Sequence, residues 1–334
     1  MWKVTNNTNK VLLDKFNNTI VNTLFLLLLE MKKFDYLDYR ETIIYQECSA
    51  KNVIEYVFGW KKKGLQFSSL FLDVINNYTL VVIRNYYQDY KKQNKQIGQG
   101  DYNVAQVKVC TELESIFVDV FYTNLFNDSQ IWNNLLGVDF NRRIFHDNFY
   151  KDNRIDVCPF CDIDTLNAKS NIDVEHFLPK QKFPYLALNP MNLISSCRAC
   201  NFPEEGKGSN VISPITNPYI EEIADKVECS IDYSNKRIDI YEKDKKRQDV
   251  ANYLKLLKLK DRYSRERTFH KVYTRCESIF EIISMLMNNN EADIGSIEMY
   301  VRKQQKQQPL MKAVLDVVHD PDLRQYVAKM KGMQ

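Results

Sequence analysis

Four cysteines in two Cys-x-x-Cys pairs have the spacing of a metal site. Cys158 and Cys161 form the first pair, and Cys197 and Cys200 form the second. In structural zinc sites, two such pairs form tight turns, and their four thiolates surround one zinc ion tetrahedrally. Four unrelated buried cysteines would rarely have this spacing, so the sequence favours a structural zinc ion. A closed set of four thiolates leaves no coordination position for water or substrate, so any catalysis must depend on other residues.

The segment between and just after these pairs contains residue types that can hydrolyse a phosphodiester bond. His176 could be the base that activates water, because an unperturbed imidazole titrates near pH ~6.5. Glu175 and Asn201 offer the hard oxygen ligands that Mg2+ or Mn2+ prefers. Asp173 is a further candidate ligand, because it shares a strand face with Glu175. Asn192 could hydrogen-bond the imidazole and fix its orientation.

Each of these residues also has a plain structural interpretation. A single histidine is commonly a packed or surface residue, and Asp173 could be an ordinary solvated carboxylate. The chain is rich in asparagine, so Asn192 and Asn201 could match by composition alone. However, the chain has only 4 histidines, and one of them lies between the two cysteine pairs in order with the other residue types. That order favours the functional interpretation.

In this order, Glu175-His176, Asn192 and Asn201 resemble the motif of the HNH endonucleases, the ββα-metal nucleases, in the variant that carries zinc-binding cysteine pairs. The resemblance implies catalysis by His176 and Asn192 on two paired strands, and a metal ligand on the helix that follows. It also implies a catalytic Mg2+ or Mn2+ ion held by Glu175, Asn201 and Asp173. This chain has Glu175 where the family more often has Asp, and Asn201 where many members have His.

The run from Glu175 to Lys180, the later Asn192-Leu193 and the final Cys-x-x-Cys-Asn are also similar to the HNH subunit of Septu-type bacterial defence systems, the PtuB-like proteins. That resemblance is confined to the middle of the chain. It implies a role in anti-phage defence and action together with a partner ATPase.

Four basic residues near these motifs are candidate contacts for nucleic-acid phosphates. Lys180 and Lys182 follow the histidine, and Arg198 lies inside the second cysteine pair. Lys207 belongs to a Lys-Gly pair like the one that many zinc-binding HNH proteins carry after the asparagine. Arg and Lys side chains bind phosphates by charge-assisted hydrogen bonds, although most surface lysines make no such contact.

The overall charge is not that of a protein that coats nucleic acid. The 334 residues have a formal charge of +3, so any nucleic-acid contact must come from local patches. The basic runs at 61–63, 86–92 and 258–267 are interpreted as solvated helix faces. The 8 cysteines and the absence of a recognisable signal peptide predict a reducing cytoplasm. The most apolar run, 23–29, is far shorter than the ~20 residues that span a bilayer and predicts a core helix.

Hydrophobic periodicity predicts helices on both sides of the cysteine-containing segment, at 11–31, 50–63, 80–96, 103–125, 131–136, 247–287, 299–303 and 310–319. The segment 230–241 alternates apolar and polar residues on both sides of a polar turn and predicts a β-hairpin. The expected fold class is therefore mainly α with a small α+β insert. We expect a helical domain at 1–150, a ββα-metal core with the zinc site at 151–214, and a hairpin with a helical region at 215–334.

Two classes of function follow. The first is a metal-dependent HNH endonuclease that hydrolyses nucleic acid, with DNA favoured, in anti-phage defence. The second is a zinc-stabilised module that binds nucleic acid or protein without catalysis, in which His176 is structural. The ordered set of one Glu, one His and two Asn favours the first class, because a binding module needs none of them. The helical flanks are expected to position and restrain the nuclease through a partner ATPase or self-association.

Overall fold

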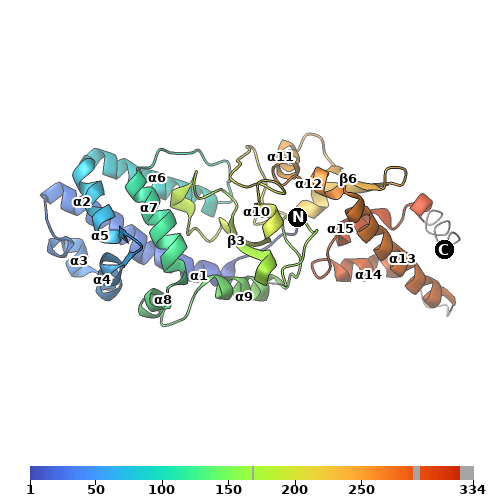
Figure 1. Cartoon of the computed structure of the whole chain (residues 1–334), viewed down its shortest axis with the longest axis horizontal. Helices are drawn as coiled ribbons and strands as arrows, with labels where there is room; N and C mark the ends of the chain where they lie inside the picture. The colour runs from blue at the N-terminus through green and yellow to red at the C-terminus, as the bar shows by residue number, and fades with distance from the viewer. Residues whose placement is uncertain (168, 289–293, 324–334) are drawn as a thin grey trace. The chain divides into compact units, whose positions relative to one another are not determined.

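The computed structural model describes residues 1–167, 169–288 and 294–323. Within this part, the protein is mainly helical (Figure 1). It has three two-stranded sheets. This agrees with the expected mainly α class with a small amount of β structure.

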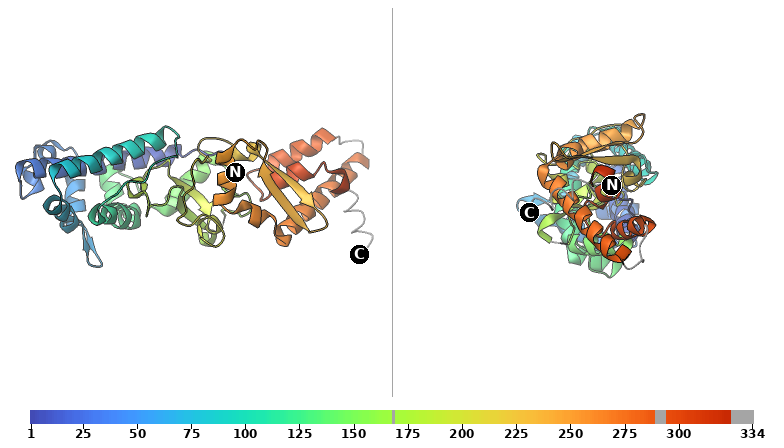
Figure 2. Two further views of the ribbon diagram at one scale, coloured as in Figure 1. Left: turned by 90° about the horizontal axis from the view of Figure 1, so that it is seen from above. Right: turned by 90° about the vertical axis from the view of Figure 1, so that its right-hand side faces the viewer.

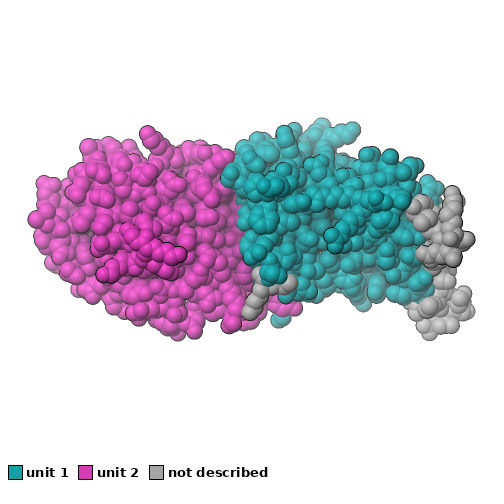
Figure 3. Space-filling view, in the orientation of Figure 1, with its two compact units in different colours: residues 1–4, 153–173, 195–334 teal, residues 5–152, 174–194 magenta. Residues whose placement is uncertain are grey.

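The residues form two compact units, which Figure 3 shows in different colours. Unit 1 contains residues 1–4, 153–173 and 195–334, and unit 2 contains residues 5–152 and 174–194. The predicted core segment contributes residues to both units. The three-part division of the chain stays a prediction.

Unit 2 begins with one long helix and contains most of the other helices of the N-terminal half. The long helix consists of α1 (Asn7–Phe16), a π-helical segment η1 (Asn17–Val21) and α2 (Asn22–Phe34), which matches the helix predicted at 11–31. The helices that follow are α3 (Ile43–Glu47), α4 (Lys51–Gly59), α5 (Phe67–Asn77), α6 (Leu80–Gly98), α7 (Thr111–Ser115) with the π-helical η3 (Ile116–Asn124), α8 (Ser129–Leu136) and α9 (Arg142–Asn153).

The long helix supplies much of the core of unit 2. Its 28 residues are long and apolar enough to cross a membrane by length and composition alone. Yet Phe16, Ile20, Leu24 and Leu27 along it are buried within a cluster of aromatic and aliphatic side chains. This burial is that of a core helix in a globular unit, as the sequence predicts.

Two predicted helices of unit 2 are wrong at one end. The helix predicted at 50–63 ends at Gly59 and is followed by the hairpin of β1 (Lys61–Lys62) and β2 (Leu65–Gln66). Lys63 and Gly64 both have positive φ angles, as a two-residue hairpin turn requires. The helix predicted at 103–125 begins only at Thr111, because β-branched valines precede this point and acidic residues in the first turn stabilise the helix N-terminus there.

Unit 1 contains the C-terminal helices and a long hairpin. Strands β5 (Val227–Asp232) and β6 (Arg237–Glu242) form the predicted hairpin, visible in Figure 2, which packs on α15 through β5 and on other helices through β6. The helices are α11 (Gln248–Leu256), α12 (Leu259–Tyr263), α13 (Glu266–Asn288), α14 (Ile294–Gln304) and α15 (Met311–Val317). The single helix predicted at 247–287 is divided, because Lys258 adopts a left-handed conformation between α11 and α12.

A third small sheet contains most of the candidate chemistry. Strand β3 (Ile172–His176) pairs with β4 (Leu193–Cys197), and the short helix α10 (Arg198–Asn201) follows β4 directly. The chain order in this segment is therefore strand, strand, helix. The residues between the strands form a loop, 177–192, whose side chains are largely buried.

Phe121 provides a test of the aromatic core of unit 2. Its ring is 1% exposed and lies 5.5 Å from the ring of Phe16 and 5.6 Å from that of Phe117. Phe121→Ala should lower the free energy of unfolding by about 3–5 kcal/mol, because it removes a large buried ring and leaves a cavity. Phe34→Ala, at a ring that is 51% exposed, should cost less than about 1 kcal/mol. Urea denaturation followed by circular dichroism measures both, and equal losses would contradict this description of the core.

Candidate functional site

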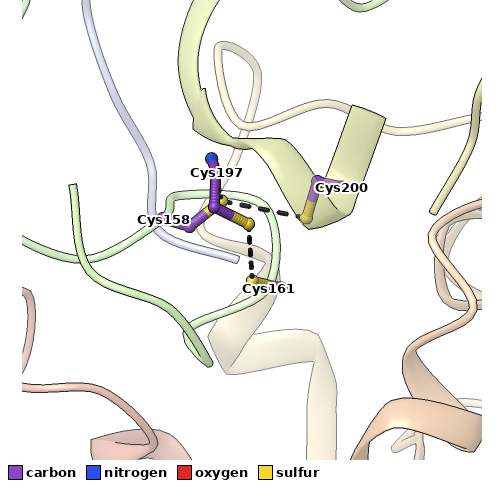
Figure 4. Close-up of side chains that lie close together, drawn as sticks. All are labelled: Cys158, Cys161, Cys197 and Cys200. Atoms are coloured by element: carbon purple, nitrogen blue, oxygen red, sulfur yellow. Dashed lines mark hydrogen bonds between the residues drawn. The ribbon is translucent and has the colours of Figure 1, made fainter. Parts of the chain in front are cut away.

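The four predicted cysteines lie together in unit 1 (Figure 4). Their sulfur atoms all lie within 4.8 Å of one another, and all four residues are buried. Cys158 Sγ lies 3.8 Å from Cys200 Sγ, and Cys161 Sγ lies 3.8 Å from Cys197 Sγ. The two pairs, distant in sequence, therefore form one cluster that can hold a metal ion.

These distances fit a tetrahedral zinc ion. A zinc–sulfur bond of about 2.3 Å in a regular tetrahedron separates neighbouring sulfurs by about 3.8 Å. Disulfide bonds would bring two sulfurs to about 2 Å. All eight cysteines lie in the described part of the chain, and none of them forms a disulfide. The four thiolates would fill every coordination position, so that zinc here would be structural.

Backbone and side-chain donors surround the sulfur atoms. The backbone N–H of Cys197 donates to Cys158 Sγ at 3.3 Å, and that of Ile163 donates to Cys161 Sγ at 3.4 Å. Arg262 donates to Cys200 Sγ at 3.1 Å and to Cys161 Sγ at 3.5 Å. Four thiolates with one Zn2+ carry a net charge of −2, so these donors face an anionic centre.

Arg262 is a residue that the sequence analysis missed. It lies within the basic run 258–267, which we interpreted as solvated, but its side chain is only 3% exposed. Its guanidinium also pairs with the Asp164 carboxylate at 2.9 Å. Burial alone would lower the pKa of Arg262, but the neighbouring cysteine thiolates outweigh this effect and raise it. The only sequence signal is that Arg262 shares a helix face with Leu259, three residues earlier.

The segment after the second cysteine pair closes over it. A Cβ atom on Gly206 would lie 2.2 Å from the carbonyl oxygen of Cys200, so only glycine fits there without a shift of backbone. The next residue, Lys207, donates its backbone N–H to the same oxygen at 3.0 Å. Lys207 is fully buried and its ammonium donates to Gly208 O. Lys207 is thus buried at a position where we expect a phosphate contact from the sequence.

Asp173, Arg198 and Asn201 come together in unit 1. Arg198 Nε lies 3.6 Å from Asp173 Oδ1, and Asn201 Nδ2 lies 3.4 Å from Asp173 Oδ2. The Asp173 side chain is 30% exposed and that of Arg198 is 49% exposed, so both reach solvent. The two predicted metal ligands, Asp173 and Asn201, therefore form one accessible polar cluster with Arg198, a predicted phosphate contact.

His176 lies at the end of β3 in unit 2, and its residue is 4% exposed. Its Nε2 lies 3.0 Å from Ala187 O. Because a carbonyl oxygen can only accept, Nε2 must carry the proton, and the neutral ring then has its lone pair on Nδ1. The Tyr122 ring packs 4.3 Å from the imidazole, centre to centre, and its hydroxyl donates to Val174 O at 2.8 Å. The imidazole is thus held in one tautomer and one orientation.

Asn192 supports the loop between the strands instead of the ring. Its Oδ1 accepts from the Leu178 N–H at 2.7 Å, and its Nδ2 donates to Leu178 O at 2.9 Å and to Leu186 O at 3.2 Å. We expected Asn192 to orient the imidazole, but the Ala187 carbonyl makes that contact. Asn192 fixes the backbone just before Ala187, so its effect on His176 is indirect.

Further asparagines of unit 2 hold the same loop from outside. Asn6 Nδ2 donates to Pro190 O at 2.7 Å, Asn17 Nδ2 donates to Leu188 O at 3.0 Å, and Asn94 Nδ2 donates to Tyr185 O at 3.2 Å. Asn17 belongs to the π-helical η1, and Tyr122 belongs to the π-helical η3. π-helical turns are rare and are frequent at functional sites. Both turns here direct a side chain to the β3–β4 region.

Three more predicted residues, Glu175, Lys180 and Lys182, belong to unit 2. Glu175 is 5% exposed, and Lys182 is partly exposed. Lys180 Nζ lies 5.4 Å from the centre of the Tyr122 ring, and Arg142 Cζ lies 4.7 Å from it. Arg142 and Tyr122 are further residues that the sequence analysis missed, because they lie in separate helices with no recognisable motif.

Two known proteins are similar to this chain over part of its length. The Septu protein PtuB of Bacillus thuringiensis is 36% identical over 64 residues, which cover 19% of this chain and 24% of that protein. Protein ea31 of Escherichia phage lambda is 29% identical over 150 residues, which cover 38% of this chain and 46% of that protein. The chain thus spans less than half the length of each relative. No family model and no solved structure matches it.

The cysteine cluster predicts about one tightly bound zinc per chain. Cys158→Ser and Cys200→Ser should each lose the zinc and unfold or aggregate, because the binding energy of a structural zinc, about 10–16 kcal/mol, is as large as the stability of most domains. Elemental analysis and thermal denaturation measure both effects. Cys48→Ser, at a partly exposed cysteine outside the cluster, is the control and should retain the zinc. Soluble, folded wild-type protein without zinc would refute the assignment.

Proposed function

We propose that β3, β4 and α10 form the catalytic core of an HNH-type, metal-dependent endonuclease that hydrolyses phosphodiester bonds of nucleic acid, with DNA favoured. The observation that carries this proposal is the fixed state of His176. A ring locked by Ala187 O through Nε2, with its lone pair on Nδ1, is prepared to accept a proton from water. Any buried N–H needs an acceptor, so the feature that the proposal uses is the tautomer that this bond selects, with Nδ1 as the acceptor nitrogen.

The oxygens of Asp173 and Asn201 are the proposed metal ligands, with Glu175 as a third. Asn201 Nδ2 lies 3.4 Å from Asp173 Oδ2, so the two side chains are neighbours, and a flip of the Asn201 amide would turn its oxygen toward the same ion. Such an ion, when bound, supplies positive charge at the scissile phosphate and at the leaving oxygen. Thiolates prefer zinc, and hard oxygens prefer magnesium or manganese. Zinc would therefore bind the four cysteines, and Mg2+ or Mn2+ would bind the oxygen ligands.

In this proposal, cationic side chains of each unit would bind the phosphate backbone. Arg198 is half exposed and next to Asp173. Lys180 and Arg142 lie over the Tyr122 ring, which itself packs on His176. Charged donors near the reacting phosphate stabilise negative charge that develops during hydrolysis. Lys182, three residues beyond Pro179, is a further phosphate contact in this proposal.

The biological role that we propose is bacterial anti-phage defence in the cytoplasm. It is supported by the partial similarity to the Septu protein PtuB. We also propose that a partner ATPase or self-association controls the nuclease, because a cytoplasmic nuclease of broad specificity would endanger the DNA of its own cell. The helical flanks would provide this contact.

The first test replaces the proposed base. His176→Ala should lower the rate of plasmid cleavage with Mg2+ or Mn2+ by about 100-fold or more, because general-base catalysis contributes roughly 10²–10⁴-fold. Zinc content should not change, since His176 is not one of the four sulfur ligands. His319→Ala, at an exposed histidine outside this segment, should cleave at the wild-type rate.

Three results would contradict the assignment. Undiminished cleavage by His176→Ala would exclude His176 as the base. Wild-type protein that binds DNA but leaves it uncut with either metal, alone and with its partner, would favour the zinc-stabilised binding module. A chelator that stops cleavage only when it also removes zinc would argue against a second, catalytic metal.

The second test addresses the metal ligands. Asp173→Asn, Glu175→Ala and Asn201→Ala should raise the concentration of Mg2+ or Mn2+ needed for half-maximal cleavage, and excess metal should partly restore the rate, because the loss is one of metal affinity. Glu204→Ala, at an exposed carboxylate just after α10, should leave the metal dependence unchanged. If the Asp173 variant loses stability but keeps the wild-type metal dependence, then Asp173 is only the ion-pair partner of Arg198.

A further inference from the structure

A cavity lies in unit 1, between α13 and the helices α14 and α15. Its volume is about 590 Å³. Small-molecule sites in proteins commonly have volumes of about 300–1,000 Å³. None of the residues assigned above to zinc, to metal or to catalysis lines this cavity. It therefore requires its own explanation.

One end of the cavity is strongly basic. Arg267, Lys271 and Arg275 line it from successive turns of α13. Residues four apart on a helix are about 6 Å apart along its axis and lie on one face, so the three cations form a row about 12 Å long. His270 also lines the cavity, but its Nε2 lies 3.4 Å from the Glu266 carboxylate. Among the described lining residues there is no Asp or Glu.

Arg275 is the most informative of these cations. Its Nη1 donates to Gln308 Oε1 at 2.6 Å and lies 3.7 Å from Met311 Sδ. Within the described residues it has no carboxylate within ion-pair distance. Burial lowers the pKa of Arg275, although the more distant Asp162 carboxylate acts in the opposite direction. A partly buried cation without a counter-ion is unfavourable, and an anion in the cavity would relieve this cost.

The other end of the cavity is apolar and includes one aromatic ring. Ile279 and Ile282 continue the same face of α13, and Met311 on α15 lines the cavity next to Arg275. Tyr300, on α14, contributes a ring that is 41% exposed. The cavity is also lined by the hydroxyl groups of Thr274 and Ser278 and by the side-chain amides of Gln304 and Gln308. The cavity is therefore cationic at one end and apolar with hydrogen-bonding groups at the other.

We propose that this cavity binds a nucleoside di- or triphosphate. A row of three cations matches several linked phosphates, because each phosphate can accept charge-assisted hydrogen bonds from Arg and Lys. The Tyr300 ring and the two isoleucines form a surface on which a flat base can stack. A single phosphate would leave part of the cationic row unpaired, and a purely apolar ligand would leave Arg275 without an anion. The proposal does not depend on the nuclease activity.

The test is calorimetric titration of the full-length, zinc-loaded protein. The titrants are ATP, GTP, CTP, UTP, sodium triphosphate, adenosine and a short 5′-phosphorylated single-stranded oligonucleotide. At least one nucleoside triphosphate should bind with a Kd in the micromolar range. It should bind at least about tenfold more tightly than triphosphate or adenosine alone, because only the nucleotide fills both ends of the cavity.

Variants then assign the binding to this cavity. Arg275→Gln should weaken nucleotide binding about tenfold or more, because it removes one charge-assisted contact. It should not lower the melting temperature of the free protein, since it also removes a partly buried charge that has no carboxylate partner among the described residues. Tyr300→Leu should weaken binding of the nucleotide but not of triphosphate. Lys303→Gln removes an exposed cation of α14 that does not line the cavity and should have no effect.

Several outcomes would overturn the proposal. These are no binding of any nucleotide at millimolar concentration, or equal binding by the wild type and Arg275→Gln. If triphosphate binds as tightly as ATP, and Tyr300→Leu does not change either affinity, then the cavity does not recognise the nucleoside. If the oligonucleotide binds more tightly than any mononucleotide, the cavity would be a contact site for nucleic acid instead of a nucleotide site. Because His176→Ala should bind the nucleotide like the wild type, failure of the nuclease proposal would not affect this result.

Discussion

The candidate site depends on how the buried backbone of the loop between β3 and β4 is hydrogen-bonded. A buried carbonyl without a donor is costly, so a loop that enters the interior must find a partner for each polar group. Here the side-chain amides of Asn192, Asn17 and Asn6 supply many of these donors. The loop is thereby fixed, and with it the Ala187 carbonyl that orients His176. Asn17, in the π-helical η1, and Asn6, just before α1, thus connect the N-terminal part of unit 2 to this loop.

A comparable constraint governs the cysteine cluster, where charge must be balanced in a buried place. A zinc ion with four thiolates carries two net negative charges, and exclusion from water makes such a charge expensive. Arg262, nearly inaccessible to solvent, directs its guanidinium at two of the sulfurs and at Asp164. The same α12 also contributes Tyr263, whose hydroxyl donates to Cys161 O at 2.9 Å. The metal site therefore includes α12 as well as the two cysteine pairs.

What the sequence predicts well is local. The Cys-x-x-Cys spacing fixes a cluster because each pair forms one turn, and the long helix at 11–31 and the hairpin at 230–241 are visible in the periodicity of apolar residues. The partner of His176 was not predictable, because it is a backbone carbonyl, which every residue type carries. Arg262 and Lys207 were assigned to the surface by their charge. Only the fold shows that Arg262 donates to two of the cysteine sulfurs and that Lys207 is buried.

Arg262 and Lys207 show that the number of cationic residues does not identify a phosphate site. The partner that each cation already has is more informative. Arg262 is neutralised by thiolates, whereas Arg275 has no carboxylate partner among the described residues. Arg198 is an intermediate case, because its partner Asp173 is also a proposed metal ligand. If Asp173 coordinates a divalent ion, its carboxylate has less negative charge to share with Arg198, since the ion competes for the same oxygens. The guanidinium, which is half exposed, would then be available to a phosphate only in the metal-loaded protein. Metal binding and substrate binding would in this way favour each other without any movement of the backbone.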